Sequence, residues 1–305
     1  MTALPQTRAP LFANVICMLS MLVWAAGLPA AELLIGKVPP LPLTAARMAM
    51  AAAVLLPLWL VLEGSTPLKS ADWGKGILIG GLTIGLGAFM LVIGQSMTGP
   101  VTVAIISASM PLIGIAIEVI LDGRKVTSAL IVGLVLALLG GVMALGSGAA
   151  SVNLGLGALF CFASVLTFTI GSRLTVTAFP ALSPLGRTTL TLTGAAILTS
   201  VAALIHAATG ATSLDWALLG WPEFGALAVF SIGGLAISQV LWIMAVGHLG
   251  IGLASLHINA TPFYVMLILY VLGGAWSWPQ AIAAAVVGLG VLIAQDLVSQ
   301  YRTRP

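Results

Sequence analysis

Long apolar stretches dominate this chain, and short polar breaks separate them. Each stretch is about 20 residues long, which is the length that an α-helix needs to cross a bilayer. The breaks carry turn residues, such as Pro39-Pro40 and the run from Gly64 to Pro67. The pattern predicts ten membrane-spanning helices, at residues 10–31, 41–62, 74–95, 98–121, 127–147, 153–173, 184–206, 221–246, 250–273 and 278–298.

These stretches favour helices over the strands of a membrane barrel. Barrel strands alternate in polarity and are about half as long, and backbone groups in lipid must find partners within the protein. No break is long enough to hold a soluble domain. We therefore expect an all-α integral membrane protein. The first stretch resembles a signal peptide, since Arg8 precedes it and small residues follow Gly27. A second apolar stretch follows almost at once, so we interpret the first as a retained spanning helix.

Composition excludes other classes of protein. The chain has 305 residues, of which 60% are hydrophobic and 6% are charged, whereas a soluble protein carries about 25% charged residues. This is too little charge for a soluble enzyme, a nucleic-acid-binding protein or a disordered chain. The two cysteines, Cys17 and Cys161, lie within apolar stretches and form no CxxC pair. The sequence thus predicts buried thiols and no metal site.

The lysines and arginines predict an orientation. If the N-terminus is cytoplasmic, only Lys37 and Arg47 fall on the outer side. Cytoplasmic loops are enriched in basic residues, so we expect both termini in the cytoplasm and a multi-pass protein of the bacterial inner (plasma) membrane. The nine inner residues are Arg8, Lys69, Lys75, Arg124, Lys125, Arg173, Arg187, Arg302 and Arg304.

The two halves of the chain carry matching features. Arg47, near the start of the second predicted helix, matches Arg187 near the start of the seventh. Each half has five helices, and after an odd number of crossings the chain is on the other side of the membrane. The second half must therefore have the inverted topology. The sequence therefore predicts two inverted five-helix repeats, residues 1–148 and 149–305. Secondary transporters commonly have this architecture, with the substrate near the midplane. Glycine, proline and glycine also recur at a spacing of 12 residues, as Gly99, Pro111 and Gly123 and as Gly250, Pro262 and Gly274.

Several of these residues resemble a known family. Trp24, Arg47 and the run from Leu241 through Ala254-Ser255 to Pro262 resemble the drug/metabolite transporter superfamily, EamA type. The resemblance covers nearly the whole chain as two tandem units, and within the superfamily the chain is most similar to the bacterial aromatic amino acid exporter group. The chain departs from the family at the Glu that often follows the proline-containing helix, because Arg124 and Ala275 stand there. No role of that Glu is carried over. The ends of the two repeats resemble the family at Gly133, Gly141-Val142 and Gly290-Val291.

Motifs for other chemistry are absent. The chain has no GxxxxGK[ST] sequence, which argues against ATP-driven transport, and no HExxH. His206, His248 and His257 are not spaced to hold haem or a metal. We expect neither an enzyme nor a cofactor, and a membrane enzyme or a structural subunit is the alternative from another class. Overlapping small-xxx-small spacings predict close helix contacts rather than a nucleotide loop, at Gly76, Gly80, Gly81 and Gly85.

Aromatic and polar side chains near the helix centres predict a substrate pocket. His257, Thr261 and Tyr264 share one helix face at positions i, i+4 and i+7. For His257, an interhelical hydrogen bond and a titrating wall of the pocket are both open interpretations. Pro111 and Pro262 are expected to break their helices and free backbone groups. The predicted substrate-binding residues are Met21, Trp24, Met90, Ser109, Ser164, Phe168, Gln239, Trp242, His257 and Tyr264.

The predicted midplane holds no fixed charge, and this limits the substrate. A phosphate or dicarboxylate needs a buried Arg or Lys, and a cationic drug needs a buried carboxylate. A neutral, aromatic amino acid fits better, because Trp, Phe and Met side chains pack against its ring. Export of other amphipathic metabolites or drugs is the alternative, and both uniport and proton exchange stay open. We expect no nucleic acid partner and a functional monomer in the lipid bilayer, since ten helices can enclose a pathway within one chain.

Overall fold

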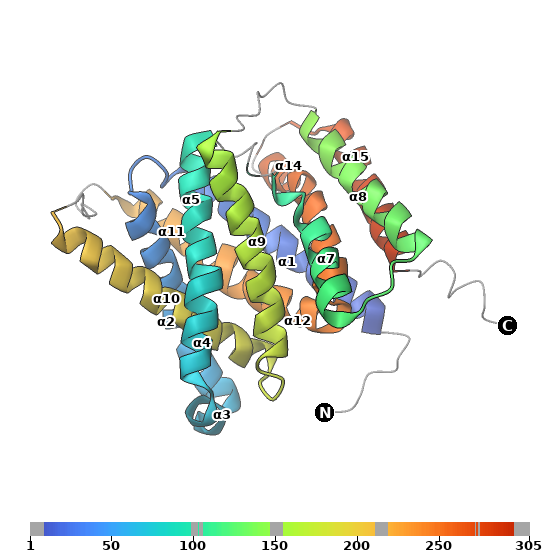
Figure 1. Ribbon diagram of the computed structural model, residues 1–305. Helices are drawn as coiled ribbons and strands as arrows, with labels where there is room; N and C mark the ends of the chain where they lie inside the picture. The colour runs from blue at the N-terminus through green and yellow to red at the C-terminus, as the bar shows by residue number, and fades with distance from the viewer. Residues whose placement is uncertain are drawn as a thin grey trace.

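A computed structural model describes residues 9–98, 103, 106–146, 155–210, 219–271, 273 and 275–295. These residues form a bundle of helices (Figure 1). Within them, β hydrogen bonding is limited to one isolated bridge between Ile35 and Val38. The all-α prediction is confirmed for this part of the chain. In the first half the helices are α1 Ala9–Glu32, α2 Pro40–Glu63, α3 Ser65–Ser70, α4 Trp73–Ile79, η1 Gly80–Gly85, α5 Leu86–Thr98, α7 Met110–Asp122 and α8 Ser128–Gly146.

The second half follows with a similar set of elements. Its helices are α9 Leu156–Thr177, α10 Pro184–Ala208, α11 Trp221–Ala228, η3 Val229–Ile237, α12 Ser238–Leu249, α13 Ile251–Ser255, η4 Leu256–Ala260, α14 Thr261–Val271 and α15 Trp278–Ala294. In Figure 1, α5 lies beside α9, and α8 lies beside α15 at one edge of the bundle.

Six helices among the described residues are long and apolar enough to cross a membrane. They coincide with six of the ten predicted spans, and they indicate a multi-pass membrane protein. At the other four predicted spans the described residues form shorter helices, namely α7, α8, α13 to α14, and α15. The count of ten spans and the inverted repeat therefore stay predictions. The six long helices are Leu11–Glu32, Pro40–Glu63, Trp73–Thr98, Leu156–Thr177, Pro184–Ala208 and Trp221–Leu249.

Two of the long helices contain π-helical segments, η1 and η3. A π-helical turn holds one more residue than an α-helical turn, and such segments are frequent at functional sites. At the end of η3, the backbone N–H of Ser238 reaches back five residues to the carbonyl oxygen of Gly233. The hydrophobic pattern predicts neither segment.

The two predicted proline breaks lie at the starts of helices. Pro111 is the second residue of α7, and the turn before it ends with Ser109, whose hydroxyl donates to the Ile106 carbonyl at 2.7 Å. Pro262 is the second residue of α14, and the 3₁₀ segment η4 precedes it. Proline is favoured in the first turn of a helix because its missing N–H leaves no partner unsatisfied there. Gly99 and Gly274 of the repeat pattern lie outside the described residues.

The predicted glycine contacts of α4 and η1 are confirmed, and their partner is α10. A Cβ atom placed on Gly80 would lie 1.8 Å from the Thr191 carbonyl oxygen, so the two backbones touch. Buried threonines of α10 bond back to their own helix, as Thr193 does to the Thr189 carbonyl at 2.7 Å. Most threonine hydroxyls of this buried helix therefore find a hydrogen-bond partner within the helix itself.

Polar side chains link helices of the two predicted halves. Asn14 of α1 and Gln295 exchange two amide hydrogen bonds of 2.7 Å. At the end of α7, Arg173 of α9 donates to Asp122, and this guanidinium holds the pKa of the Asp122 carboxyl below its usual value. Glu118, in the last turns of α7, is also buried, with 6% of its surface exposed.

Glu118 joins α7 to α13. Its carboxylate pairs with Arg124 and accepts the backbone N–H of Gly252 at 2.9 Å. We expect Glu118→Ala to lower the free energy of unfolding by about 1–3 kcal/mol, because it leaves buried donors without partners. The melting temperature in detergent measures this. The matched control is Lys37→Ala, because the Lys37–Glu223 pair is exposed and exposed pairs contribute about 0–1 kcal/mol. Equal shifts in both variants would contradict the role of Glu118.

Candidate functional site

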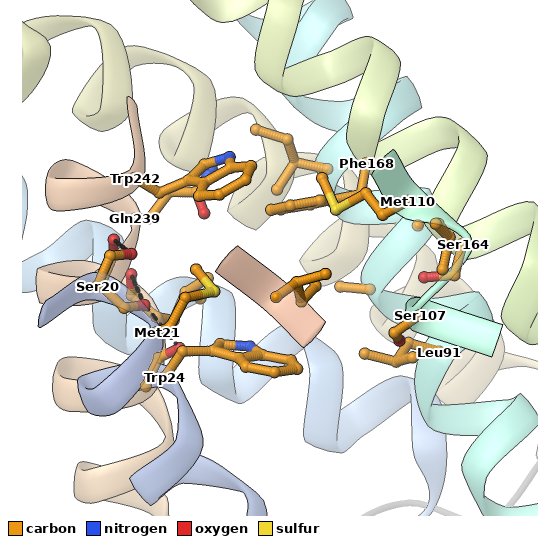
Figure 2. Close-up of a pocket in the computed structure, with 18 of the residues that line it drawn as sticks. Ser20, Met21, Trp24, Leu91, Ser107, Met110, Ser164, Phe168, Gln239 and Trp242 are labelled. Carbon is orange, nitrogen blue, oxygen red and sulfur yellow. Dashed lines mark hydrogen bonds between the residues drawn. The ribbon is translucent and has the colours of Figure 1, made fainter. Parts of the chain in front are cut away.

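A cavity lies between α1, α2, α5, α9, η3 and α12, and side chains from both predicted halves line it (Figure 2). It encloses about 790 Å³ of empty space, including the part that is open to solvent. Pockets for small molecules are mostly apolar with a few polar groups. The lining of this cavity therefore has the character of a small-molecule site.

Aromatic rings bound the cavity on two sides. Figure 2 shows the indoles of Trp242 and Trp24 facing each other across it, with Met21 beside Trp24. The Trp242 indole N–H donates to the Ser172 hydroxyl at 2.9 Å, which fixes the ring. Phe168 stacks on Trp242, with ring centroids 6.3 Å apart and an interplanar angle of 28°. Such faces favour an aromatic ligand, which gains dispersion and quadrupole interactions there.

Hydroxyl and amide groups also line the cavity beside these rings. The Ser20 hydroxyl donates to the Ser238 carbonyl at 2.7 Å, and the Ser238 hydroxyl donates to the Gly234 carbonyl at 2.9 Å. Gln239 is 4% exposed, and its Nε2 has no hydrogen-bond partner within the described chain. A buried donor without a partner is costly. Gln239 is thus a candidate to donate to a bound molecule.

Arg47 also lines the cavity, and this corrects one expectation from the sequence. The sequence predicts a pocket that holds no fixed charge, and the predicted place of Arg47 on the outer side of the membrane stays a prediction. In the structure the guanidinium is buried and donates to the Phe230 and Gly234 carbonyls of η3, at 3.2 and 3.3 Å. The side chain lies seven residues into α2 and reaches η3, which the helical pattern alone does not reveal.

Six of the predicted substrate-binding residues line the cavity together. They come from α1, α9 and α12 and are Met21, Trp24, Ser164, Phe168, Gln239 and Trp242. Their role in binding stays a prediction. The cavity also has lining residues that the prediction did not select, among them Ser20, Arg47, Met48 and Met110. Ser20 lies one helical turn from Trp24, so extending the face of Trp24 by one turn would have found it.

The other four predicted residues lie outside the cavity lining. His257 is buried in η4, with Nδ1 3.2 Å from the Ala254 carbonyl oxygen. Tyr264 packs in the apolar core beside the cavity. Met90 lies half-buried on α5, and Ser109 ends the turn before α7. Their predicted roles, including a proton site at His257, stay predictions.

No three His, Cys, Asp or Glu side chains of the described residues gather where they could hold a metal ion. Cys17 and Cys161 are both buried as free thiols. The Cys17 thiol lies 3.5 Å from the Ala254 carbonyl oxygen and donates to it. The described lining of the cavity offers rings, thioethers, hydroxyls, an amide and one guanidinium.

Comparisons with known proteins agree with this picture. Residues 11–146 match the EamA-like transporter family. An uncharacterized transporter of Bacillus subtilis (strain 168), YyaM, is 24% identical over 284 residues, which cover 90% of this chain and 91% of the relative. A solved crystal structure matches 95% of this chain and 99% of its own, with a TM-score of 0.78 and 22% identity, so this likeness shows the fold alone. Residues 11–146 are therefore similar to the EamA-like transporter family, and the comparisons point to a membrane transporter rather than to an enzyme.

Proposed function

We propose that this chain is a secondary transporter that exports neutral, aromatic amino acids across the bacterial inner membrane by alternating access. The cavity carries this proposal. Its lining comes from α1, α2 and α5 in residues 1–148 and from α9, η3 and α12 in residues 149–305. A site between two halves opens to each side in turn when one half rocks against the other.

The lining supports an aromatic substrate. Trp24, Phe168 and Trp242 offer ring faces, and Met21 and Met48 offer flexible thioethers that adapt to a ring. Neutral hydroxyl and amide groups stand beside them. Other amphipathic metabolites or drugs are the alternative substrates, since apolar lining alone discriminates weakly between ring systems.

The expected setting follows from the same features. Six apolar helices place the chain in a membrane, and the excess of Lys and Arg in the predicted inner loops favours cytoplasmic termini. A cavity that one chain encloses favours a functional monomer, whose partners are the small-molecule substrate and the surrounding lipid.

Uptake into liposomes tests the function. Purified protein is reconstituted, and radiolabelled phenylalanine, radiolabelled threonine and a cationic dye are followed separately. We expect phenylalanine uptake to exceed that in protein-free liposomes by 10-fold or more, with slower uptake of threonine. Uptake of the dye alone would contradict the amino acid proposal and favour the drug exporter.

A pH gradient across the same liposomes tests proton coupling through His257. If His257 carries the proton, the gradient changes the initial rate of the native protein and has no effect in His257→Ala. His206→Ala is the matched control, because His206 lies exposed near the end of α10. Equal rates with and without the gradient in the native protein would leave uniport as the mode of transport.

A further inference from the structure

Arg47 is a buried cation, and no acidic side chain of the described residues pairs with it. Its side chain is 5% exposed, and its guanidinium lies 3.7 Å from the centre of the Phe230 ring. Its two hydrogen bonds go to backbone carbonyls of η3. No carboxylate of the described residues lies within ion-pair distance of it. Carbonyl dipoles and a ring face solvate a cation but leave its net charge in place.

Such a charge is costly inside a membrane protein. A buried ion is tolerated when it is paired with another charge, when it is bonded to backbone carbonyls as Arg47 is, or when it faces a water-filled cavity, and such ions often mark a substrate pathway. A guanidinium has five N–H donors, and Nε and Nη2 each use one for a carbonyl. Nη1 has no hydrogen bond among the described residues, and Arg47 lines the cavity. Donors of Arg47 are therefore left for a bound molecule.

Gln239 supplies a second free donor in the same cavity. The Gly234 carbonyl accepts from both Arg47 Nη2 and the Ser238 hydroxyl, so these side chains meet at one atom. Gln239 directly follows Ser238, it lines the same cavity, and its Nε2 lacks a partner. The Arg47 Nη1 and the Gln239 Nε2 thus each offer a donor in the lining of one cavity, where an anionic oxygen would find them.

The other lining residues limit which further charges the ligand can carry besides that anionic group. No Asp or Glu of the described residues lines the cavity, and Arg47 is the one charged side chain in the described lining. One positive charge matches a single carboxylate, which Arg binds through paired N–H···O bonds. A cation in the ligand would find hydroxyl and carbonyl oxygens there but no opposite charge.

We propose that Arg47 binds the carboxylate of the substrate, with Gln239 as the second donor, and that the cavity takes amphipathic monocarboxylates. The apolar or aromatic part of the ligand lies among Trp24, Phe168 and Trp242. This inference rests on the proposed function and names its substrate class: the carboxylate is required and the ammonium group is not. Aromatic amino acids bind as members of this class, and so do aromatic carboxylates without an amino group.

Three related ligands test this on the native protein. Calorimetry in detergent measures the Kd of each ligand. L-phenylalanine carries both an amino group and a carboxylate, 3-phenylpropanoate lacks the amino group, and L-phenylalaninamide lacks the carboxylate. We expect the first two to bind and the amide to bind at least 10-fold more weakly. An amide that binds as tightly as L-phenylalanine, or a 3-phenylpropanoate that does not bind, would overturn the inference.

The outcomes separate the inference from the proposed function. Transport of phenylalanine together with tight binding of the amide would sustain the function and overturn the role of Arg47. Binding of 3-phenylpropanoate without any transport of amino acids would sustain the role of Arg47 and overturn the proposed function. No binding of any of the three ligands would contradict both.

Two variants locate the effect. We expect Arg47→Gln to raise the Kd of 3-phenylpropanoate at least 10-fold and to leave the Kd of L-phenylalaninamide unchanged. Arg187→Gln is the matched control: Arg187 also donates to two backbone carbonyls, those of Phe179 and Pro180 at 2.9 Å, and it is not part of the cavity lining. A purely structural Arg47 would weaken all three ligands alike, and that result would overturn the inference.

Gln239→Glu keeps the test decisive if Arg47→Gln does not fold. It adds a carboxylate of the same size to the lining of the cavity that holds Arg47, so the cavity gains an internal anion that opposes a carboxylate ligand. We expect the Kd of 3-phenylpropanoate for this variant to be at least 10-fold higher than for the native protein. Its melting temperature should be no lower than the native value. Unchanged binding of 3-phenylpropanoate to this variant would overturn the inference.

Discussion

Trp242→Ala is expected to lower phenylalanine transport by at least 10-fold, the largest effect of any single change in the cavity. The side chain is 2% exposed and forms one wall of the site. Its removal takes away the ring that stacks on Phe168 and the indole N–H that the Ser172 hydroxyl accepts. Truncating a buried Trp also costs about 3–5 kcal/mol of stability. Initial rates in liposomes, normalised to folded protein, measure the effect on transport.

Two further variants separate binding from stability. Trp242→Phe keeps a ring and loses the hydrogen bond, so we expect it to retain most of the affinity for phenylalanine. Trp59→Ala is the matched control, since Trp59 is fully buried in α2 and does not line the cavity. It should lower the melting temperature by a similar amount and leave the KM unchanged. Equal losses of transport in Trp242→Ala and Trp59→Ala would show that the cavity wall has no special role.

Gly80→Ala is expected to destabilise the protein most among changes away from the cavity. The added methyl group would lie 1.8 Å from the Thr191 carbonyl oxygen, and both groups belong to helix backbones that cannot move separately. Overpacking of this kind costs about 1–3 kcal/mol and sometimes more. The melting temperature and the yield of monodisperse protein in detergent measure the loss.

Gly233→Ala is the matched control for this change. Gly233 lies in the other π-helical segment, η3, and a Cβ atom there meets nothing within 4 Å. We expect it to leave the melting temperature within about 1 °C of the native value, since a substitution without new contacts costs little. A Gly80→Ala protein as stable as Gly233→Ala would show that α10 and η1 are not packed backbone to backbone.

The long spans were predictable from the sequence because lipid imposes a strict rule on length and polarity. Helices such as α2 and α10 follow from about 20 apolar residues between turn residues. The prolines at the starts of α7 and α14 were predictable in the same way, because proline restricts its local backbone. Each of these features depends on neighbouring residues in the sequence.

The features that were not predictable depend on contacts between distant segments. The face of His257, Thr261 and Tyr264 assumes 3.6 residues per turn, but His257 lies in the 3₁₀ segment η4, where each turn holds three residues. None of the three lies in the described lining of the cavity, and their role in binding stays a prediction. Arg47 was assigned to the outer side by counting charges, and its place on the cavity wall depends on carbonyls 183 and 187 residues away in η3.

The most direct test of the central claim is to locate a bound ligand. Crystals of the native protein soaked with 4-iodo-L-phenylalanine would report the iodine by anomalous diffraction. We predict an iodine signal inside the cavity among Trp24, Phe168 and Trp242, with the carboxylate at Arg47. An iodine signal only outside this cavity, from a protein that transports the compound in liposomes, would contradict the account.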